Sequence, residues 1–184
     1  MMSASALPVD RALESRLRNA VRDIPDYPKP GIVFKDITPL LGDPLLFAEA
    51  CHAMAAPYRT DGVTHVAAIE SRGFLFGGPV AQLLGAGVVP VRKRGKLPYQ
   101  AEREEYALEY GVDSLEMHVD ALPAGARVLV IDDVLATGGT AAAACRLVER
   151  LGGAIAGCSF LIRLGFLSGL AELNGRRASN LIVY

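Results

Sequence analysis

The sequence lacks the features by which membrane and secreted proteins are usually recognised. Its 184 residues contain no apolar run approaching the roughly 20 residues that span a bilayer, although 51% of them are hydrophobic. The first residues show no apolar stretch followed by a small-residue cleavage site. We therefore expect a soluble protein of the cytoplasm that has no membrane partner.

Cysteine and histidine are scarce, and neither is spaced as a set of ligands. The three cysteines, Cys51, Cys145 and Cys158, form no CxxC pair, and the three histidines are scattered. A disulfide framework or a zinc site needs paired spacings of these residues. We expect buried free thiols and no metal site built from protein ligands alone.

The chain also lacks net charge. A formal charge of −1 argues against a general nucleic-acid surface. The positive charge is nevertheless uneven, because Arg92, Lys93, Arg94 and Lys96 lie within five residues. A local basic cluster on a nearly neutral chain indicates a small anionic ligand rather than a polymer.

Length and patterning predict a single α/β domain over residues 1–184. Apolar segments of strand character alternate with helical ones, which favours a mostly parallel central sheet flanked by helices. Strands are predicted at residues 65–69, 88–94, 126–133 and 154–164, and helices at 10–22, 43–58, 77–87 and 138–153. We expect disorder at residues 1–8, an extended proline-rich loop from about residue 24, and a flexible loop at 95–106 that leads into a hairpin.

The most informative stretch is VLVIDDVLATGGT, residues Val128–Thr140. An apolar strand ends in two acids, and Gly138-Gly139-Thr140 then opens a helix. Ligands of open α/β sheets bind at the carboxyl ends of strands, and a glycine-rich turn at a helix N-terminus points backbone N–H groups at a phosphate. Asp132 and Asp133 are unsuited to phosphate but suited to sugar hydroxyls, which carboxylates bind by charge-assisted hydrogen bonds. The stretch predicts a site for a ribose 5-phosphate group.

This stretch closely resembles the signature by which type I phosphoribosyltransferases bind phosphoribosyl pyrophosphate (PRPP). The resemblance implies a mostly parallel central sheet flanked by helices, with a small hood that recognises the base, here at about residues 24–41. It also implies a set of PRPP-binding residues in the signature: Asp132, Asp133, Ala136, Thr137, Gly138, Gly139 and Thr140.

Other segments are similar to those of the adenine-specific members of this family. They are PGIVFKDITPLL (residues 30–41), ESRGFLFG (70–77), VRKRGKLP (91–98) and LEYG (108–111). The similarity runs from about Ile24 to Gly165. It implies a purine salvage enzyme that transfers the 5-phosphoribosyl group from PRPP to adenine, giving AMP and pyrophosphate.

The resemblance assigns roles to the basic residues and to one glutamate. Ser71 and Arg72 would hold the pyrophosphate, since arginine can chelate its oxygens in a bidentate manner. Arg92, Lys93 and Lys96 would neutralise the same group, in part across the interface of a homodimer. Glu109 is the candidate catalytic residue, where a carboxyl group can move a proton at the imidazole ring of adenine.

Three consecutive residues, Val33, Phe34 and Lys35, are the candidate adenine-binding residues. The ring of Phe34 can stack on a purine. Backbone groups of Val33 and Lys35 can read the amino group and the adjacent ring nitrogen of adenine, which distinguishes it from a 6-oxopurine. Family members often carry arginine in place of Lys35, a change that matters little if backbone atoms read the base.

The resemblance further implies a magnesium ion, held mainly by pyrophosphate and ribose oxygens and by water. The loop at residues 95–106 would close over the substrates as a lid and keep out water. Its sequence, YQAEREE, is the part of the chain least similar to the family.

Two alternative functions remain at this stage. The first is the same fold acting on hypoxanthine, guanine or xanthine, which the residue 30–41 segment and LEYG disfavour. The second is a PRPP-sensing transcription regulator, which needs a DNA-binding module. The 24 N-terminal residues hold one short helix, too little for a helix-turn-helix.

Overall fold

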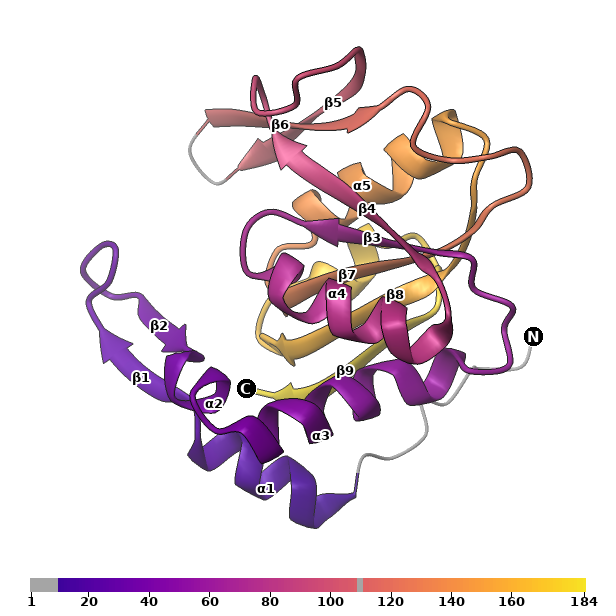
Figure 1. Ribbon diagram of the computed structural model, residues 1–184. Helices are drawn as coiled ribbons and strands as arrows, with labels where there is room; N and C mark the ends of the chain where they lie inside the picture. Colours follow the sequence, from indigo (N-terminus) through magenta and orange to yellow (C-terminus); the bar gives the residue numbers. More distant parts are fainter. Residues whose placement is uncertain (1–9, 109–110) are drawn as a thin grey trace.

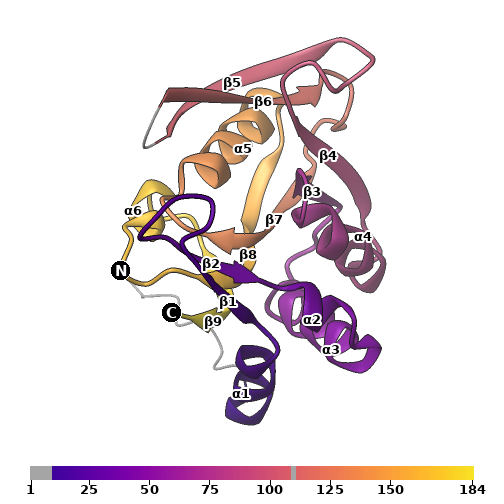
Figure 2. The ribbon, with the colours of Figure 1, turned by 90° about the vertical axis from the view of Figure 1, so that its left-hand side faces the viewer.

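The computed structural model describes residues 10–108 and 111–184 of the chain. Its centre is a seven-stranded sheet in the order β5-β6-β4-β3-β7-β8-β9, called the main sheet below (Figure 1). A separate pair of strands, β1 and β2, projects from one side of the molecule (Figures 1 and 2). The mixed α/β architecture predicted from the sequence is confirmed.

Five neighbouring strands of the main sheet are parallel, and the remaining two form an antiparallel extension beside β4. The parallel strands are β3 (His65–Ile69), β4 (Gly87–Lys93), β7 (Arg127–Leu135), β8 (Ala154–Arg163) and β9 (Ala178–Val183). The extension is the hairpin of β5 (Ala101–Leu108) and β6 (Gly111–His118). The prediction of a mostly parallel sheet is therefore correct.

Alternate residues of the central strands face two separate hydrophobic clusters. On β7, Val128 and Val130 pack on the side of α5 (Gly139–Arg150), whereas Leu129 and Ile131 pack on the side of α4 (Gly73–Leu84). Figure 2 shows these two helices on opposite faces of the sheet. Strands buried on both faces are apolar throughout, which explains the continuous hydrophobic run in the sequence.

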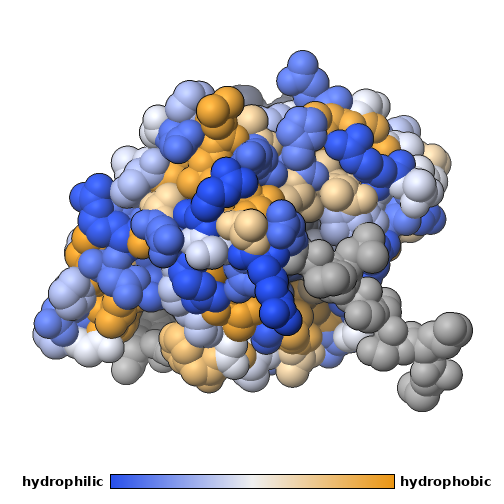
Figure 3. Space-filling view, turned by 90° about the horizontal axis from the view of Figure 1, so that it is seen from below, coloured by the Kyte–Doolittle hydropathy of each residue, from blue (hydrophilic) through white to orange (hydrophobic). Residues whose placement is uncertain are grey.

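The remaining helices lie mostly on the α4 face. Figure 1 shows α3 beside α4, with α1 next to α3. They are α1 (Arg11–Asn19), α2 (Thr38–Leu41), α3 (Pro44–Ala55) with the 3-10 turn Ala56–Tyr58, and the short α6 (Gly169–Glu172) after β8. The face seen from below in Figure 3 has hydrophilic and hydrophobic residues interspersed. Among the described residues, no helix has the length and hydropathy that crossing a membrane requires.

The connections of β3 and β7 diverge, and this positions the site. From β3 the chain passes through α4 to β4 on one side, and from β7 it passes through α5 to β8 on the other. Neighbouring strands that lead to opposite sides leave a crevice at their carboxyl ends, where open α/β sheets bind ligands. The loops after β3 and β7 therefore face a common space.

All three cysteines are buried free thiols, as predicted. The Sγ atoms of Cys145 on α5 and Cys158 on β8 lie 3.6 Å apart. Burial raises the pKa of the Cys51 thiol to about 11.

The proline-rich segment is more regular than the extended loop predicted for it. β1 (Arg22–Pro25) and β2 (Val33–Asp36) pair antiparallel, so the segment is a hairpin, called the N-terminal hairpin below. Pro25 ends the first strand, and the Tyr27–Pro28 peptide bond is cis. Proline lacks a backbone N–H, and at the end of a two-stranded ribbon this donor is not needed to continue the ladder.

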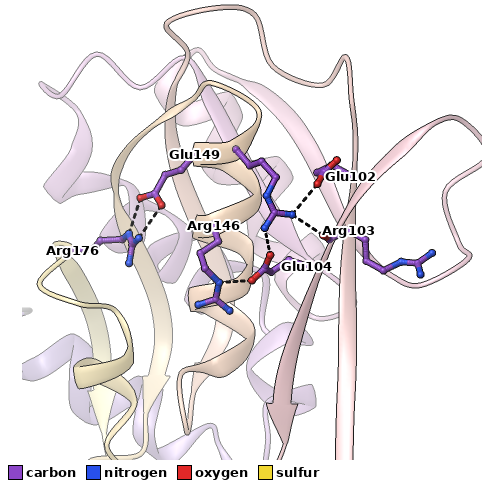
Figure 4. A network of polar contacts seen from close by, with 7 residues as sticks. Glu102, Arg103, Glu104, Arg146, Glu149 and Arg176 are labelled. Atoms are coloured by element: carbon purple, nitrogen blue, oxygen red, sulfur yellow. Dashed lines mark hydrogen bonds and ion pairs between the residues drawn. The ribbon is translucent and has the colours of Figure 1, made fainter.

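The prediction of an irregular loop over residues 95–106 is wrong for its second half. Residues 101–106 lie in β5 and pair with β6 along the whole strand. Three charged side chains of α5 and β5 reinforce this position: Arg146 Nε lies 2.5 Å from Glu104 Oε1, and Arg150 also binds Glu104 (Figure 4). From residue 102 to residue 106, less exposed side chains alternate with exposed ones, which is the period of a strand. The number of charges hid this signal in the sequence. Whether the segment acts as a lid stays a prediction.

Two helix boundaries also differ from the prediction. α1 ends at Asn19 rather than near residue 22, because the chain enters β1 there. α4 begins at Gly73 rather than at residue 77, because the turn after β3 leads directly into the helix. The expectation of disorder at residues 1–8 falls outside the described residues.

Candidate active site

The loops after β3 and β7 enclose a cavity of about 590 Å³, called the first cavity below. Eight of the predicted PRPP-binding residues line it: Ser71, Arg72, Lys93, Lys96, Asp132, Asp133, Ala136 and Thr140. Four residues that the sequence did not indicate also line it: Glu70, Tyr106, Asp113 and Val134. Segments separated by some 60 residues in the sequence are thus assembled around one space, as the carboxyl-end rule requires.

Two adjacent carboxylates stand at the end of β7. Asp133 is buried, and its N–H donates to Asp132 Oδ1 at 2.9 Å. Burial and the neighbouring charge of Asp133 raise the pKa of Asp132 well above its usual range. Burial also raises the pKa of Asp133, although the Arg72 guanidinium opposes this rise. The pair is poised to accept hydrogen bonds from a ligand.

Arg72 connects the turn after β3 to this acidic pair. Its Nε lies 3.0 Å from Asp133 Oδ2, an oxygen for which the described residues provide no hydrogen bond. The close approach depends on Gly73, where a Cβ would lie 2.9 Å from the carbonyl oxygen of Ile131 and 3.1 Å from Asp132 Oδ1. A side chain at that position would push the turn away from β7. The Glu70–Ser71 peptide bond in this turn is cis.

The basic segment is held by acidic residues of the same chain. Glu70 Oε2 accepts from Arg92 Nε at 3.2 Å and from the N–H of Lys93 at 3.1 Å, and Glu70 also pairs with Lys96. Burial would raise the pKa of Glu70, but these hydrogen bonds and positive charges lower it below its ordinary value. Lys93 Nζ lies 3.1 Å from Asp113 Oδ2. Lys93 and Lys96 line the first cavity, whereas Arg92 is not among its described lining residues.

The glycine loop, residues 136–140, owes its shape to close packing on α6. Gly138 has φ +88°, and a Cβ there would lie 2.5 Å from the carbonyl oxygen of Gly169. A Cβ on Gly169 would in turn lie 2.2 Å from the carbonyl oxygen of Ala136. α5 begins at Gly139, and the first N–H groups of a helix have no partner within it. These donors and the helix dipole suit the loop to a phosphate group.

A second cavity, of about 770 Å³, lies on the other side of the glycine loop. The N-terminal hairpin, the segment after β8 and the residue after β9 supply most of its lining. Its lining residues are Asp23, Lys29, Gly31, Ile32, Val33, Lys35, Ala136, Thr137, Leu164, Phe166, Leu167 and Tyr184. Ala136 lines both cavities, so the two spaces are adjacent at the glycine loop.

Phe34 takes a different position from Val33 and Lys35. Its ring is not among the described lining of the second cavity. Instead it makes an edge contact with Tyr27 at a centroid distance of 5.2 Å, and Arg72 Cζ lies 4.9 Å from its centroid. Phe34 therefore connects the N-terminal hairpin to the turn that carries Arg72. Its contact with a base stays a prediction.

The remaining predicted residues are placed as follows. Gly138 is buried under α6, and Gly139 opens α5 beside Thr140. Glu109, the predicted catalytic residue, lies outside the described residues.

Sequence patterns missed the apolar side of the second cavity. Leu164, Phe166 and Leu167 directly follow β8, so the rule that parallel strands present ligand sites at their carboxyl ends could have indicated them. Phe166 is 75% exposed, an unusual position for a phenylalanine that lines no site. Tyr184 follows β9, and no spacing in the sequence pointed to it.

Comparisons with known proteins agree on one family. Residues 40–165 match the family model described as a phosphoribosyl transferase domain. The adenine phosphoribosyltransferase of Myxococcus xanthus is 55% identical over 95% of this chain and 95% of its own length.

Solved structures give the same result. The crystal structure of adenine phosphoribosyltransferase from Rhodothermus marinus has a TM-score of 0.91 at 50% identity, covering 95% of this chain and 100% of that one. The Saccharomyces cerevisiae enzyme, solved with an imino-altritol bisphosphate and adenine, has a TM-score of 0.87 at 38% identity, over 94% of this chain and 99% of its own.

Proposed function

The chain belongs to the adenine phosphoribosyltransferase family, and from this premise we propose that its two cavities bind the two substrates side by side. PRPP occupies the first cavity and adenine the second, and the 5-phosphoribosyl group passes to adenine to give AMP and pyrophosphate. The observation that carries this proposal is the position of Ala136, which lines both cavities at the glycine loop. The anomeric carbon of PRPP then faces the base across that residue.

The first cavity and the glycine loop beside it offer a separate partner for each part of PRPP. The 5-phosphate binds the N–H groups and hydroxyls of that loop, at Thr137, Gly138, Gly139 and Thr140. Of these, Thr140 lines the first cavity and Thr137 the second. Asp132 and Asp133 accept hydrogen bonds from the ribose hydroxyls. Ser71, Arg72, Lys93 and Lys96 line the same cavity. Ser71 donates a hydrogen bond to the pyrophosphate, and the three cations neutralise it.

The edge of β2 reads the base in the second cavity. Val33 and Lys35 are two residues apart on one strand, so their backbone groups point to the same edge. An N–H and a C=O on that edge match the acceptor nitrogen and the donor amino group of adenine. A 6-oxopurine presents the opposite pattern and leaves groups unpaired, at a cost of about 1–3 kcal/mol each. Phe34 supports this edge and Arg72 together.

During the transfer, the bond between the anomeric carbon and pyrophosphate breaks while adenine attacks from the opposite face. The carbon gains positive charge, and the carboxylates of Asp132 and Asp133 lie where they stabilise it. Glu109 takes the role of the group that moves the proton of the imidazole ring of adenine. Residues 95–106 form the lid that keeps water from the reacting carbon.

Magnesium fits the donor set of the first cavity. The described residues contain no group of three or more His, Cys, Asp or Glu side chains that could hold a metal on their own. Asp133 Oδ2 is nonetheless a buried carboxylate oxygen without a hydrogen bond from the described residues. Pyrophosphate and ribose oxygens and water would therefore supply most of the ligands, with Asp132 and Asp133 binding that water. When bound, the ion offsets the charge of the departing pyrophosphate.

The enzyme works as a homodimer in the cytoplasm. Arg92 is turned toward Glu70 and the carbonyl oxygen of Lys96, not toward the first cavity. This placement supports a role for part of the basic segment, Arg92, Lys93 and Lys96, at the site of a neighbouring copy.

Pyrophosphate release tests the proposal. Wild type and Asp132→Ala are given PRPP and Mg²⁺ with adenine, hypoxanthine, guanine or xanthine in separate reactions. Turnover with adenine alone, lost in the variant, is expected. Turnover with a 6-oxopurine would contradict the assignment of the β2 edge. PRPP binding without turnover of any base would favour the regulator over the enzyme.

A further inference from the structure

Tyr184 lies where the main sheet meets the N-terminal hairpin. It follows β9 and lines the second cavity. Two cations contact its ring: Lys35 Nζ lies 3.8 Å from the ring centroid, and Arg18 Cζ lies 4.8 Å from it. Lys35 belongs to β2 and Arg18 to α1, so the ring contacts both the hairpin and the helix that precedes it.

The backbone of Tyr184 is fixed to the core. Its N–H donates to the carbonyl oxygen of Arg163 at 3.0 Å, and its carbonyl oxygen accepts from the N–H of Gly165 at 2.6 Å. Arg18 Nη2 donates to the carbonyl oxygen of Val183 at 2.8 Å. The ring is therefore held by the same segment that carries Leu164 into the second cavity.

The Lys35 ammonium is held from two sides. Asp23 Oδ1, its cross-strand partner in the N-terminal hairpin, lies 2.6 Å away, and the Tyr184 ring lies on the other side. Only 13% of the Lys35 side chain is exposed, so water competes weakly for the ammonium. A cation over an aromatic face is stabilised most when it is desolvated. The contact joins the hairpin to the main sheet at the residue whose backbone faces the base.

We propose that Tyr184 is a positioning residue for adenine. Through its contact with Lys35 it holds the edge of β2 at a fixed distance from Leu164, Phe166 and Leu167 across the second cavity. This inference rests on the proposed function, in which that edge reads adenine. It also gives the Lys35 side chain a role that does not involve the base, since the ammonium faces Asp23 and the ring.

The phosphate sites provide the internal comparison. The glycine loop packs on α6, and Arg72 pairs with Asp133 and also contacts Phe34 of β2. Loss of the ring should therefore weaken adenine binding more than PRPP binding. A general loss of structure would weaken both.

Steady-state kinetics with adenine and PRPP varied separately test this in Tyr184→Leu, Tyr184→Phe and Lys35→Met. Tyr184→Leu should raise KM for adenine about three- to tenfold, the range expected for losing one partly buried cation–π contact. KM for PRPP should rise less than KM for adenine. Tyr184→Phe keeps the aromatic face and should restore the low KM for adenine. Lys35→Met removes the same contact from the other side, and its effect should not add to that of Tyr184→Leu in the double variant.

Amide hydrogen exchange of residues 22–36 in the ligand-free protein gives a readout independent of turnover. Exchange there should be faster in Tyr184→Leu and in Lys35→Met and unchanged in Tyr184→Phe. Unchanged exchange, a parallel rise of both KM values, or additive effects in the double variant would overturn the inference. If the variants differ from wild type in exchange as expected, but wild type turns over no adenine, only the proposed function is contradicted.

Discussion

Arg72 Nε lies 3.0 Å from Asp133 Oδ2, whereas Asp132, the preceding residue of β7, forms no ion pair among the described residues. One guanidinium thus faces two adjacent carboxylates, of which Asp133 is buried and Asp132 is partly exposed. In the proposed function this negative charge binds the ribose hydroxyls, whereas without substrate it destabilises the folded protein. Function and stability therefore oppose each other at this pair.

Asp132→Asn should stabilise the ligand-free protein and abolish turnover. Because the pKa of Asp132 is raised in the folded state, its carboxylate form costs folding free energy at neutral pH. The Oδ1 acceptor for the N–H of Asp133 is kept in asparagine. We expect a Tm gain of a few degrees near pH 7, since about 1 kcal/mol shifts Tm by roughly 2–4 °C in a chain of this size.

The sign of this effect is set by the direction of the shift. Below the unfolded-state pKa of about 3.9, the wild-type carboxyl is protonated in both the folded and the unfolded protein. It is then uncharged, as the amide is. The Tm gain of the variant should therefore shrink as pH falls from neutral toward that value. Thermal denaturation between pH 4 and pH 8 measures it. A variant less stable than wild type at pH 7 would contradict the raised pKa.

As pH is lowered, the affinity for PRPP should begin to fall at a higher pH than it would if Asp132 had an ordinary pKa. Protonation of Asp132 removes an acceptor for the ribose hydroxyls, and its raised pKa moves that loss toward neutral pH. Calorimetric titration of PRPP over the same pH range measures the effect. The phosphate groups of PRPP also titrate, and Asp132→Asn controls for them because it lacks the carboxyl. Identical pH profiles for the two proteins would refute the assignment.

The ion-pair network between β5 and α5 should fix the hairpin on the helix that follows the glycine loop. Glu104 binds Arg146 and Arg150, and Arg150 also binds Glu102 at 2.8 Å. Figure 4 shows Arg146 and Glu104 pointing toward one another between the two elements. Burial alone would raise the pKa of Glu104, but its arginine partners lower it below the ordinary value. The carboxylate therefore stabilises the fold at neutral pH, and this contribution is lost as pH falls through its folded-state pKa.

Glu104→Gln should make the amides of residues 101–106 exchange faster and lower Tm by roughly 2–4 °C, the effect of about 1 kcal/mol. Its neighbour Glu105 is exposed and forms no ion pair with the described residues, so Glu105→Gln changes the same charge without the same contacts. The control should leave exchange and Tm as in wild type at pH 7. Equal behaviour of the two variants would show that the network contributes nothing specific.

The stretches that the sequence predicted best are those where local chemistry and fold agree. Val128–Thr140 combines an apolar strand, two acids and a glycine turn, and each feature has one structural meaning at the end of a parallel strand. β3 was predicted at its observed bounds because a short apolar run between turns leaves little choice. Val33 and Lys35 were indicated only by resemblance, and both line the second cavity, but their contact with adenine stays a prediction.

What the sequence did not predict depends on partners far along the chain. β5 carries alternating charges that mimic a loop until Arg146 and Arg150, some 40 residues away, are placed beside them. The N-terminal hairpin was hidden by three prolines, which exclude a helix but do not indicate pairing. Tyr184 and Gly169 acquire their roles only through packing, and no local pattern encodes that.

Gly169→Ala should damage PRPP binding from outside the first cavity. A Cβ at position 169 would lie 2.2 Å from the carbonyl oxygen of Ala136, and backbone cannot yield as a flexible side chain does. The glycine loop must therefore shift, and a displacement of about 1 Å at a substrate-positioning group can cost about 100-fold in rate. We expect kcat/KM for PRPP to fall by at least about tenfold.

Gly78→Ala is the matched control, because a Cβ at Gly78 on α4 meets no atom within 4 Å. It should keep wild-type kinetics and slightly raise Tm, since alanine favours a helix over glycine. Wild-type kinetics in Gly169→Ala would mean that α6 does not support the loop.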